Sequence, residues 1–169
     1  TGEIGAGKTT LCRALLNQLD ANTKTAFILN STLPEMQLLE AIVEDFGITV
    51  ERKNKVSILK QFNNFLLEEA ARGNNVVLII DEAQNIKPGM LEEIRMLSNL
   101  ETDKTKLLQI VLVGQPELKN RLASPSLKQL RQRIGVRFHI TALSRQEVPE
   151  YINHRLKVAG SNGMIHFTD

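Results

Sequence analysis

Cysteine is almost absent from this chain, which has only Cys12 among its 169 residues. A single cysteine excludes an intramolecular disulfide and fits a reducing compartment. Long apolar runs are absent too, because the longest, Val76 to Ile80, falls far short of the ~20 residues that cross a bilayer. The formal net charge of +2 is too small to demand a polyanionic partner. With no repeat, low-complexity tract or linker, the chain is predicted to form one domain with a sizeable core.

Helical and strand patterns alternate along the chain, which is typical of a parallel sheet with helices on its faces. Strands are expected at 25–29, 76–80, 107–113 and 136–140. Helices are expected after residue 8, from 34 to 46, from 56 to about 72, from 88 onward and over 148–158. The first helix is expected to turn Leu11, Leu15, Leu16 and Leu19 toward the core.

The first ten residues, T-G-E-I-G-A-G-K-T-T, carry the strongest motif. They fit G-x-x-x-x-G-K-[ST], with Gly2, Gly7, Lys8 and Thr9 at the fixed positions. This spacing predicts a loop whose backbone N–H groups converge on phosphate at a helix N-terminus. Lys8 would reach the β- and γ-phosphates, and the Thr9 hydroxyl would ligate Mg²⁺. The residues expected to bind the phosphates are Gly2, Glu3, Ile4, Gly5, Ala6, Gly7, Lys8, Thr9 and Thr10. An ordinary glycine-rich turn before a helix is the alternative.

A loop of this kind normally follows a buried strand, yet the sequence starts at Thr1 with no strand before it. We therefore expect a central strand to precede residue 1 and the chain to be an internal segment of a longer protein.

A second chemical signal follows the apolar run Val76 to Ile80, which ends in Asp81 and Glu82. Buried parallel strands deliver side chains to the crevice at their carboxyl ends, where ligands bind. Asp81 is expected to bind Mg²⁺ through a water, and Glu82 to orient and polarise the attacking water. Two solvated acids capping a strand are the alternative, which the neighbouring phosphate loop disfavours because a phosphate site needs a metal carboxylate.

The next strand ends in Val113-Gly114-Gln115-Pro116. If this strand lies between the phosphate loop and the Asp81 strand, Gln115 points at the γ-phosphate and could position the lytic water or report hydrolysis. A turn glutamine without a role is the alternative.

Six basic residues and no acidic one occur between Lys119 and Arg137. Arg133, or failing it Arg131, is placed to enter a neighbouring subunit's site and stabilise transition-state charge, as arginines at subunit edges of ring-forming ATPases do. A solvated basic face and a DNA-contacting patch are the alternatives.

Taken together, these residues resemble the AAA+ ATPases of the general secretion pathway protein A (ExeA) type. The resemblance covers almost the whole chain, and D-E-A-Q and G-Q-P-E-L are more specific than the phosphate loop. The blocks that carry it are T-G-E-I-G-A-G-K-T-T-L-C-R-A-L-L, I-I-D-E-A-Q-N, V-L-V-G-Q-P-E-L, L-R-Q-R-I and Y-I-N-H-R-L-K-V-A-G.

The resemblance implies an α/β P-loop NTPase fold of the AAA+ type, with residues 1–169 forming the ATPase core. The strand before the loop and the C-terminal helical lid, with its second sensor arginine, would lie outside it. It implies ATP and Mg²⁺ as ligands, with Glu82 as the catalytic carboxylate and Asp81 as the metal support. Gln115 would stand at the first sensor position and Arg133 would be the arginine finger.

Members of this family are cytoplasmic ATPase domains tethered to the inner membrane, and many carry a transmembrane segment and a peptidoglycan-binding region further along. The resemblance therefore implies self-association into a ring or dimer and an inner-membrane partner in a secretion or pilus machine. Two other functions stay open: a DNA-transposition helper ATPase, which shares a similar D-E-A-Q core, and a nucleotide-binding switch with little turnover.

Overall fold

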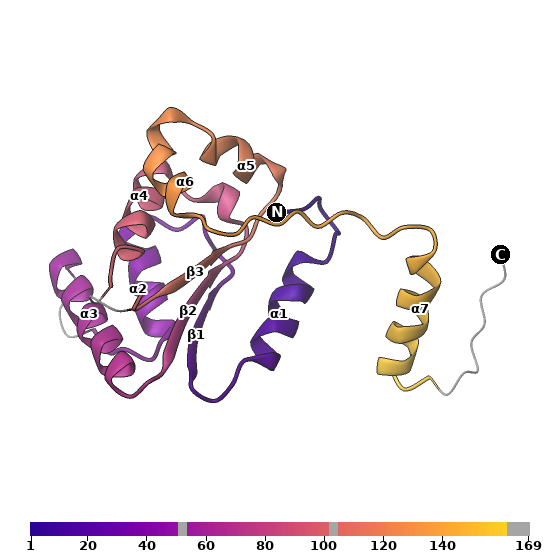
Figure 1. Cartoon of the computed structure of the whole chain (residues 1–169), viewed down its shortest axis with the longest axis horizontal. Helices are drawn as coiled ribbons and strands as arrows, with labels where there is room; N and C mark the ends of the chain where they lie inside the picture. Colours follow the sequence, from indigo (N-terminus) through magenta and orange to yellow (C-terminus); the bar gives the residue numbers. More distant parts are fainter. Residues whose placement is uncertain (51–53, 102–104, 162–169) are drawn as a thin grey trace.

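A parallel three-stranded sheet lies at the centre of the molecule (Figure 1). The computed structural model describes residues 1–50, 54–101 and 105–161. The strands are β1 (Thr23–Ile28), β2 (Asn75–Ile80) and β3 (Gln109–Leu112), and β2 lies between the other two. In the register, Leu78 lies opposite Ala26 on one side and Ile110 on the other. The three carboxyl ends therefore meet at one edge of the sheet, as the prediction for Asp81 and Gln115 requires.

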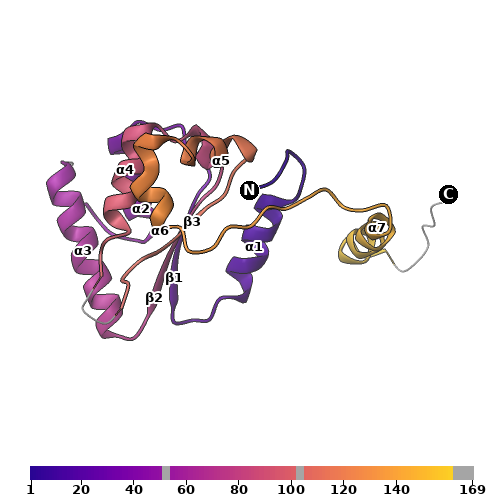
Figure 2. The ribbon, with the colours of Figure 1, turned by 45° about the horizontal axis from the view of Figure 1, so that its top comes forward.

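Helices cover both faces of the sheet: α1 lies on one face, and α2, α3 and α4 lie on the other (Figures 1 and 2). Helices α5 and α6 follow β3, and a long extended segment leads from α6 to α7. The helices are α1 (Lys8–Gln18), α2 (Glu35–Asp45), α3 (Lys55–Ala71), α4 (Pro88–Leu97), α5 (Pro116–Leu122), α6 (Lys128–Arg133) and α7 (Glu147–Val158), with short 3₁₀ turns η1 (Ala83–Asn85) and η2 (Pro125–Leu127). The predicted three-layer α/β architecture is confirmed.

Strand β2 explains why the layers form. Its residues Val76, Leu78 and Ile80 are buried in the main core with α2, α3 and α4. The alternate residues Val77 and Ile79 pack under α1 in a second, smaller cluster. Because successive side chains of a strand point to opposite faces, a strand buried on both sides must be apolar throughout. The uninterrupted run from residue 76 to residue 80 is the sequence signature of that position.

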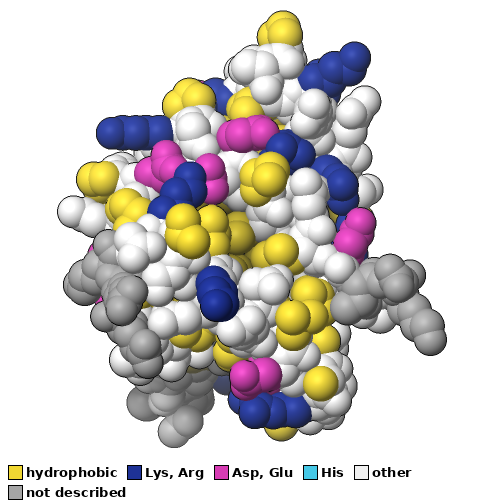
Figure 3. Space-filling view, turned by 90° about the vertical axis from the view of Figure 1, so that its left-hand side faces the viewer, with side chains coloured by type: hydrophobic (Ala, Val, Ile, Leu, Met, Phe, Trp, Pro, Cys, Tyr) yellow, Lys and Arg dark blue, Asp and Glu magenta, His cyan; other side chains and the backbone are white. Residues whose placement is uncertain are grey.

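The α3 side of the molecule is a mixed, solvated surface, with acidic and basic side chains interspersed over it (Figure 3). At the start of α3, the Asn54 side chain accepts the Ser57 N–H at 2.9 Å, which caps the helix. The Lys55 ammonium then pairs with Glu35 of α2 at 2.9 Å and with Glu93 of α4 at 2.6 Å. These pairs connect three helices at the surface, where ion pairs contribute about 0–1 kcal/mol each.

The prediction of a strand at 136–140 is wrong, because these residues form no strand in the structure. Ile140 forms a single parallel bridge with Gly2, and its N–H donates to the Thr1 carbonyl at 2.7 Å. Val136 and Phe138, which supplied the apolar alternation, are 87% and 74% exposed. Alternation makes a segment able to join a sheet, but pairing needs a neighbouring strand. Among the described residues, this segment pairs only with Thr1 and Gly2.

The inward face expected for the first helix is also wrong in part. Leu11 and Leu15 of α1 are 55% and 40% exposed, whereas Cys12 is buried beside Val77 and Ile79 with Leu16 packed against that cluster. Leucines lie on more than one face of α1, and the face that packs against the sheet is the one that contains Cys12 and Leu16.

Candidate nucleotide and catalytic site

The predicted phosphate loop forms the turn from Gly2 into α1. Gly5 and Gly7 have φ angles of +79° and +83°, and an added Cβ at either would meet nothing within 4 Å. These glycines are therefore required by backbone conformation and not by crowding, since L residues rarely adopt such angles. Gly7 caps α1, and its carbonyl accepts the Leu11 N–H at 2.9 Å. The loop thus ends at a helix N-terminus, where free N–H groups and the helix dipole favour an anion.

Lys8 lies inside this loop and is only 7% exposed. Its ammonium donates to the Gly2 carbonyl at 2.9 Å and to the Glu3 carbonyl at 2.8 Å. The loop therefore holds its own cation in place through backbone carbonyls. A phosphate entering the loop would meet this charge already positioned.

Thr9 and Asp81 come together as predicted, although 72 residues separate them. The Thr9 hydroxyl donates to Asp81 Oδ2 at 2.6 Å, and Asp81 Oδ1 accepts the Glu82 N–H at 2.9 Å. Asp81 is 2% exposed at the end of β2. A hydroxyl and a carboxylate facing each other form a hard oxygen pair of the kind that Mg²⁺ prefers. The residues present therefore fit a magnesium ion.

Glu82 has an unusual backbone, with a φ of +51° in the left-handed region. Its carbonyl accepts the hydroxyl of the buried Ser31 at 2.7 Å, and the next N–H, from Ala83, donates to the Val113 carbonyl at 2.8 Å. This conformation costs roughly 1–2 kcal/mol for a residue with a Cβ. Such strain occurs at functional sites when surrounding contacts impose it, as Ser31 and Val113 do here.

The Glu82 carboxylate receives two side-chain amides. Gln84 Nε2 donates to Oε2 at 2.5 Å, and Gln115 Nε2 donates to the same oxygen at 3.3 Å. The hydrogen bond from Gln84 lowers the pKa of Glu82, burial opposes this, and the Gln115 bond and the Lys8 charge lower it further. The carboxylate is therefore ionised at neutral pH, as a group that accepts a proton from water must be.

Gln115 lies at the carboxyl end of β3, beside the phosphate loop. It follows β3 at the start of α5, and the Gly2 N–H donates to the neighbouring Gly114 carbonyl at 3.1 Å. Strand β3 therefore lies between β2 and the phosphate loop, which is the condition that the prediction for Gln115 set. The structure brings Lys8, Thr9, Asp81, Glu82 and Gln115 to one edge of the sheet.

The arginines of the basic segment divide into two groups. Arg133 ends α6 on the surface, and its closest acidic partner among the described residues is Glu101 at 4.0 Å. Arg131 donates weakly to the Ala123 carbonyl at 3.4 Å. Arg121 of α5 instead turns inward and donates to the carbonyls of Gln84 and Ile86. The segment is thus not a uniform basic face, because one of its cations is used inside the fold.

Two side chains of this site were missed by the sequence reasoning: Gln84, which was noted only as a letter of the D-E-A-Q block, and Arg121, which was counted as one of six basic residues. The position of Gln84, two residues after a candidate catalytic acid, was a signal that could have been used. Nothing in the sequence distinguishes Arg121 from its basic neighbours.

Cys12 is buried, and burial together with the nearby Asp81 charge raises the pKa of its thiol. Cys12 packs with Val77 and Ile79 as a small apolar side chain. Over the described ranges, no helix is long and apolar enough to cross a membrane.

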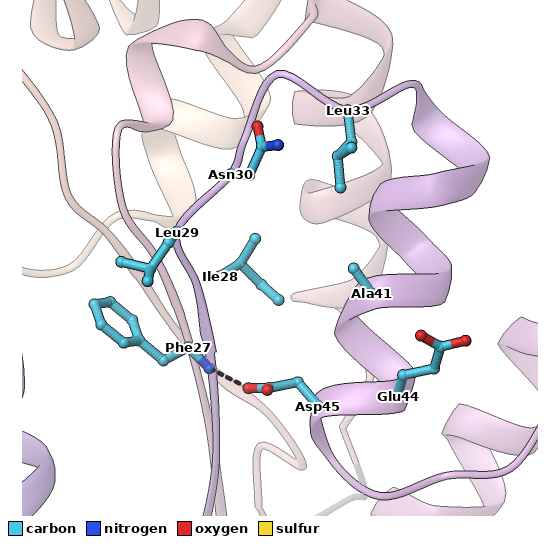
Figure 4. A pocket seen from close by; sticks show the side chains of 8 residues that line it. All are labelled: Phe27, Ile28, Leu29, Asn30, Leu33, Ala41, Glu44 and Asp45. Carbon is cyan, nitrogen blue, oxygen red and sulfur yellow. Dashed lines mark hydrogen bonds between the residues drawn. The ribbon is translucent and has the colours of Figure 1, made fainter.

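A separate hollow of about 360 Å³ lies between β1 and α2 (Figure 4). Its wall includes Phe27, Leu33 and Ala41, with Glu44 and Asp45 at one end. The Asp45 carboxylate accepts the outward Phe27 N–H at 2.6 Å, which occupies a backbone donor on the edge strand. Occupied donors discourage pairing with a further strand. The hollow shares no residue with the phosphate site.

The sequence profile of the AAA domain family matches residues 1–122 of this chain. The chain belongs to this family. This AAA domain is also 48% identical over 161 residues to general secretion pathway protein A of Aeromonas hydrophila, which confirms the resemblance drawn from the motifs. The match covers 95% of the chain and 29% of that relative, so the chain spans less than a third of the relative's length.

Among solved structures, the domain is similar to the ORC2 protein of Aeropyrum pernix in its ADPNP–ADP complexes, with a TM-score of 0.69 and 17% identity. That match covers 93% of this chain and 45% of the other. Cdc6p of Pyrobaculum aerophilum gives a TM-score of 0.67 at 19% identity, over 93% and 42% of the two chains. At such identities the likeness shows the fold alone.

Proposed function

We propose that this AAA domain binds ATP with Mg²⁺ and hydrolyses it, and that several copies act together to power the assembly of an envelope-spanning secretion or pilus machine. The observation that supports hydrolysis most directly is the position of the Glu82 carboxylate. It lies beside Asp81 and Gln115 at the carboxyl ends of adjacent strands, next to the loop that holds Lys8.

Each residue has a distinct role in this proposal. The loop N–H groups and Lys8 bind the phosphates, and Lys8 neutralises charge on the β- and γ-positions. Thr9 and Asp81 would hold the magnesium ion, which supplies charge neutralisation to the phosphates when bound. Glu82 accepts hydrogen bonds at one oxygen, which leaves the other able to orient a water and take its proton. Gln115 reaches the same region from β3 and is suited to sense the terminal phosphate.

The biological setting is proposed from the relative in A. hydrophila, whose name places it in the general secretion pathway. By this reasoning the domain works on the cytoplasmic side of a bacterial inner membrane, with a membrane-bound partner of the secretion machine. Self-association is proposed because Arg133 lies on the surface at the end of α6, where a neighbouring subunit could receive it.

We also propose that residues 1–169 form an AAA+ core that a preceding strand and a following helical lid complete. Thr1 and Gly2 bond to Ile140 on one side and to Gly114 on the other. A strand leading into Thr1 would thus lie beside β3 and give the 136–140 segment a partner.

Replacing Lys8 with alanine is expected to abolish ATP binding, because the loop directs no other side-chain cation at the phosphates. Titration of a fluorescent ATP analogue measures this, with Lys60→Ala on the exposed side of α3 as the matched control. The fold should survive, since Lys8 belongs to neither core cluster and its two charge-assisted hydrogen bonds are worth about 1.5–3 kcal/mol each. Unchanged affinity in a folded Lys8→Ala protein would remove Lys8 from the site.

A further inference from the structure

Gln84 joins the two strand ends that carry the proposed chemistry. It lies in the turn η1, two residues after Glu82, and its side chain is half-buried. Its Nε2 donates to Glu82 Oε2 at 2.5 Å, and its Oε1 accepts the backbone N–H of Gln115 at 3.1 Å. One amide therefore connects the carboxylate that follows β2 with the loop that follows β3.

Two residues from later in the chain, Gly114 and Arg121, contact Gln84 and its turn. A Cβ at Gly114 would lie 2.6 Å from Gln84 Oε1 and 3.3 Å from the Gln84 backbone nitrogen, so only glycine permits this approach. Arg121 of α5 donates to the carbonyls of Gln84 and Ile86, which fixes the backbone of the turn from its other side. Gly114 thus leaves room for the Gln84 amide and Arg121 holds the Gln84 backbone, although both lie 30 or more residues away.

The chemistry of the side chain matters as much as its position. Only an amide of this length can donate to Glu82 and accept from Gln115 at once, because a carboxylate cannot donate and a thioether does neither well. Without Gln84, the longer bond from Gln115, at 3.3 Å, would be the one hydrogen bond that side chains of the described residues give the Glu82 carboxylate. Its orientation would then be fixed by one weak contact.

We propose that Gln84 is a positioning residue, which holds the Glu82 carboxylate and the Gln115 loop in a single geometry for ATP hydrolysis. This rests on the proposed ATPase function. Gln84 does not touch the nucleotide in this account, so its loss should affect turnover and not ATP binding.

The test compares kcat, KM and melting temperature of the full-length wild-type protein with those of Gln84→Met and Gln84→Glu. Methionine keeps the volume and loses both hydrogen bonds, whereas glutamate keeps the acceptor for Gln115 and replaces the donor to Glu82 with a second carboxylate, which repels the Glu82 carboxylate. We expect kcat to fall by about 10–100-fold in both, as when supporting residues around an active site are changed. KM should not rise. The control is Gln61→Met on α3, another half-buried glutamine, which should hydrolyse ATP at the wild-type rate.

A double-mutant cycle separates positioning from a general structural role. In a Glu82→Gln background, Gln84→Met should lower single-turnover hydrolysis by clearly less than it does in the wild-type background, because the carboxylate it positions is already gone and only the bond to the Gln115 loop remains to be lost. Full multiplication of the two losses would show that Gln84 acts independently of Glu82 and would overturn the proposal. A Gln84→Met protein with wild-type kcat, or one that loses only ATP affinity, overturns it as well. If Gln84→Met does not fold, Gln84→Glu decides on the same criteria.

These outcomes stay distinct from a failure of the proposed function. Wild-type protein that releases no phosphate contradicts the ATPase proposal and removes the role of Gln84 with it. Wild-type turnover combined with unaffected Gln84 variants contradicts only the role of Gln84.

Discussion

Replacing Arg133 with alanine is expected to lower ATP turnover by on the order of 10³–10⁵-fold, the range in which arginine fingers act. Nucleotide affinity should stay unchanged, because Arg133 is expected to act on ATP bound by the neighbouring subunit. In its own subunit the guanidinium lies at the end of α6 and pairs loosely, at 4.0 Å, with Glu101. A cation held so weakly in its own subunit is free to stabilise transition-state charge in the next. Steady-state phosphate release and ATP-analogue binding measure the two expectations. Lys128→Ala serves as the matched control, since Lys128 is an exposed basic residue at the other end of the same helix α6.

Mixing variants tests whether Arg133 acts on a neighbour. Arg133→Ala subunits keep an intact phosphate loop, and Lys8→Ala subunits keep an intact Arg133. In a mixed assembly some interfaces combine one good loop with one good arginine, so part of the activity should return. If both variants still oligomerise and the mixture stays inactive, Arg133 does not act in trans, and Arg131 becomes the next candidate.

Replacing Glu82 with glutamine should stop turnover while ATP binding continues. The amide has the shape of the carboxylate but cannot take a proton from water, and general-base contributions are typically ~10²–10⁴-fold. The hydrogen bond from Gln84 lowers the pKa of Glu82, so the native group is an ionised carboxylate at neutral pH. Binding and steady-state hydrolysis should be measured together, with Glu44→Gln on the surface of α2 as the matched control. Hydrolysis at the wild-type rate would assign the base to another group.

The convergence of Lys8, Asp81, Glu82 and Gln115 could be predicted because it depends on local rules. A glycine-rich loop opens a helix, an apolar run forms a doubly buried strand, and parallel strands end at one edge. Each rule needs only neighbouring residues and the alternation of helices and strands. The structure confirms that these residues meet, whereas their catalytic roles stay predictions.

The contacts of Gln84 and Arg121 could not be predicted in the same way. They join residues that are 31 and 37 positions apart, and a glutamine in a turn or an arginine on a short helix is ordinarily solvated. Likewise, the alternation at 136–140 shows only that the segment can form a strand. Whether it does depends on the partner beside it, which sequence pattern alone does not give.

The central claim is that the domain turns ATP over and does not merely bind it as a switch. The most direct test is the amount of phosphate released per subunit by the full-length protein under excess ATP and Mg²⁺, with Glu82→Gln measured in parallel. The account predicts continued release of many phosphates per wild-type subunit and almost none from the variant, although both bind ATP. Release that ends after a single phosphate per wild-type subunit, with ATP still in excess, would contradict it and favour a nucleotide-binding switch.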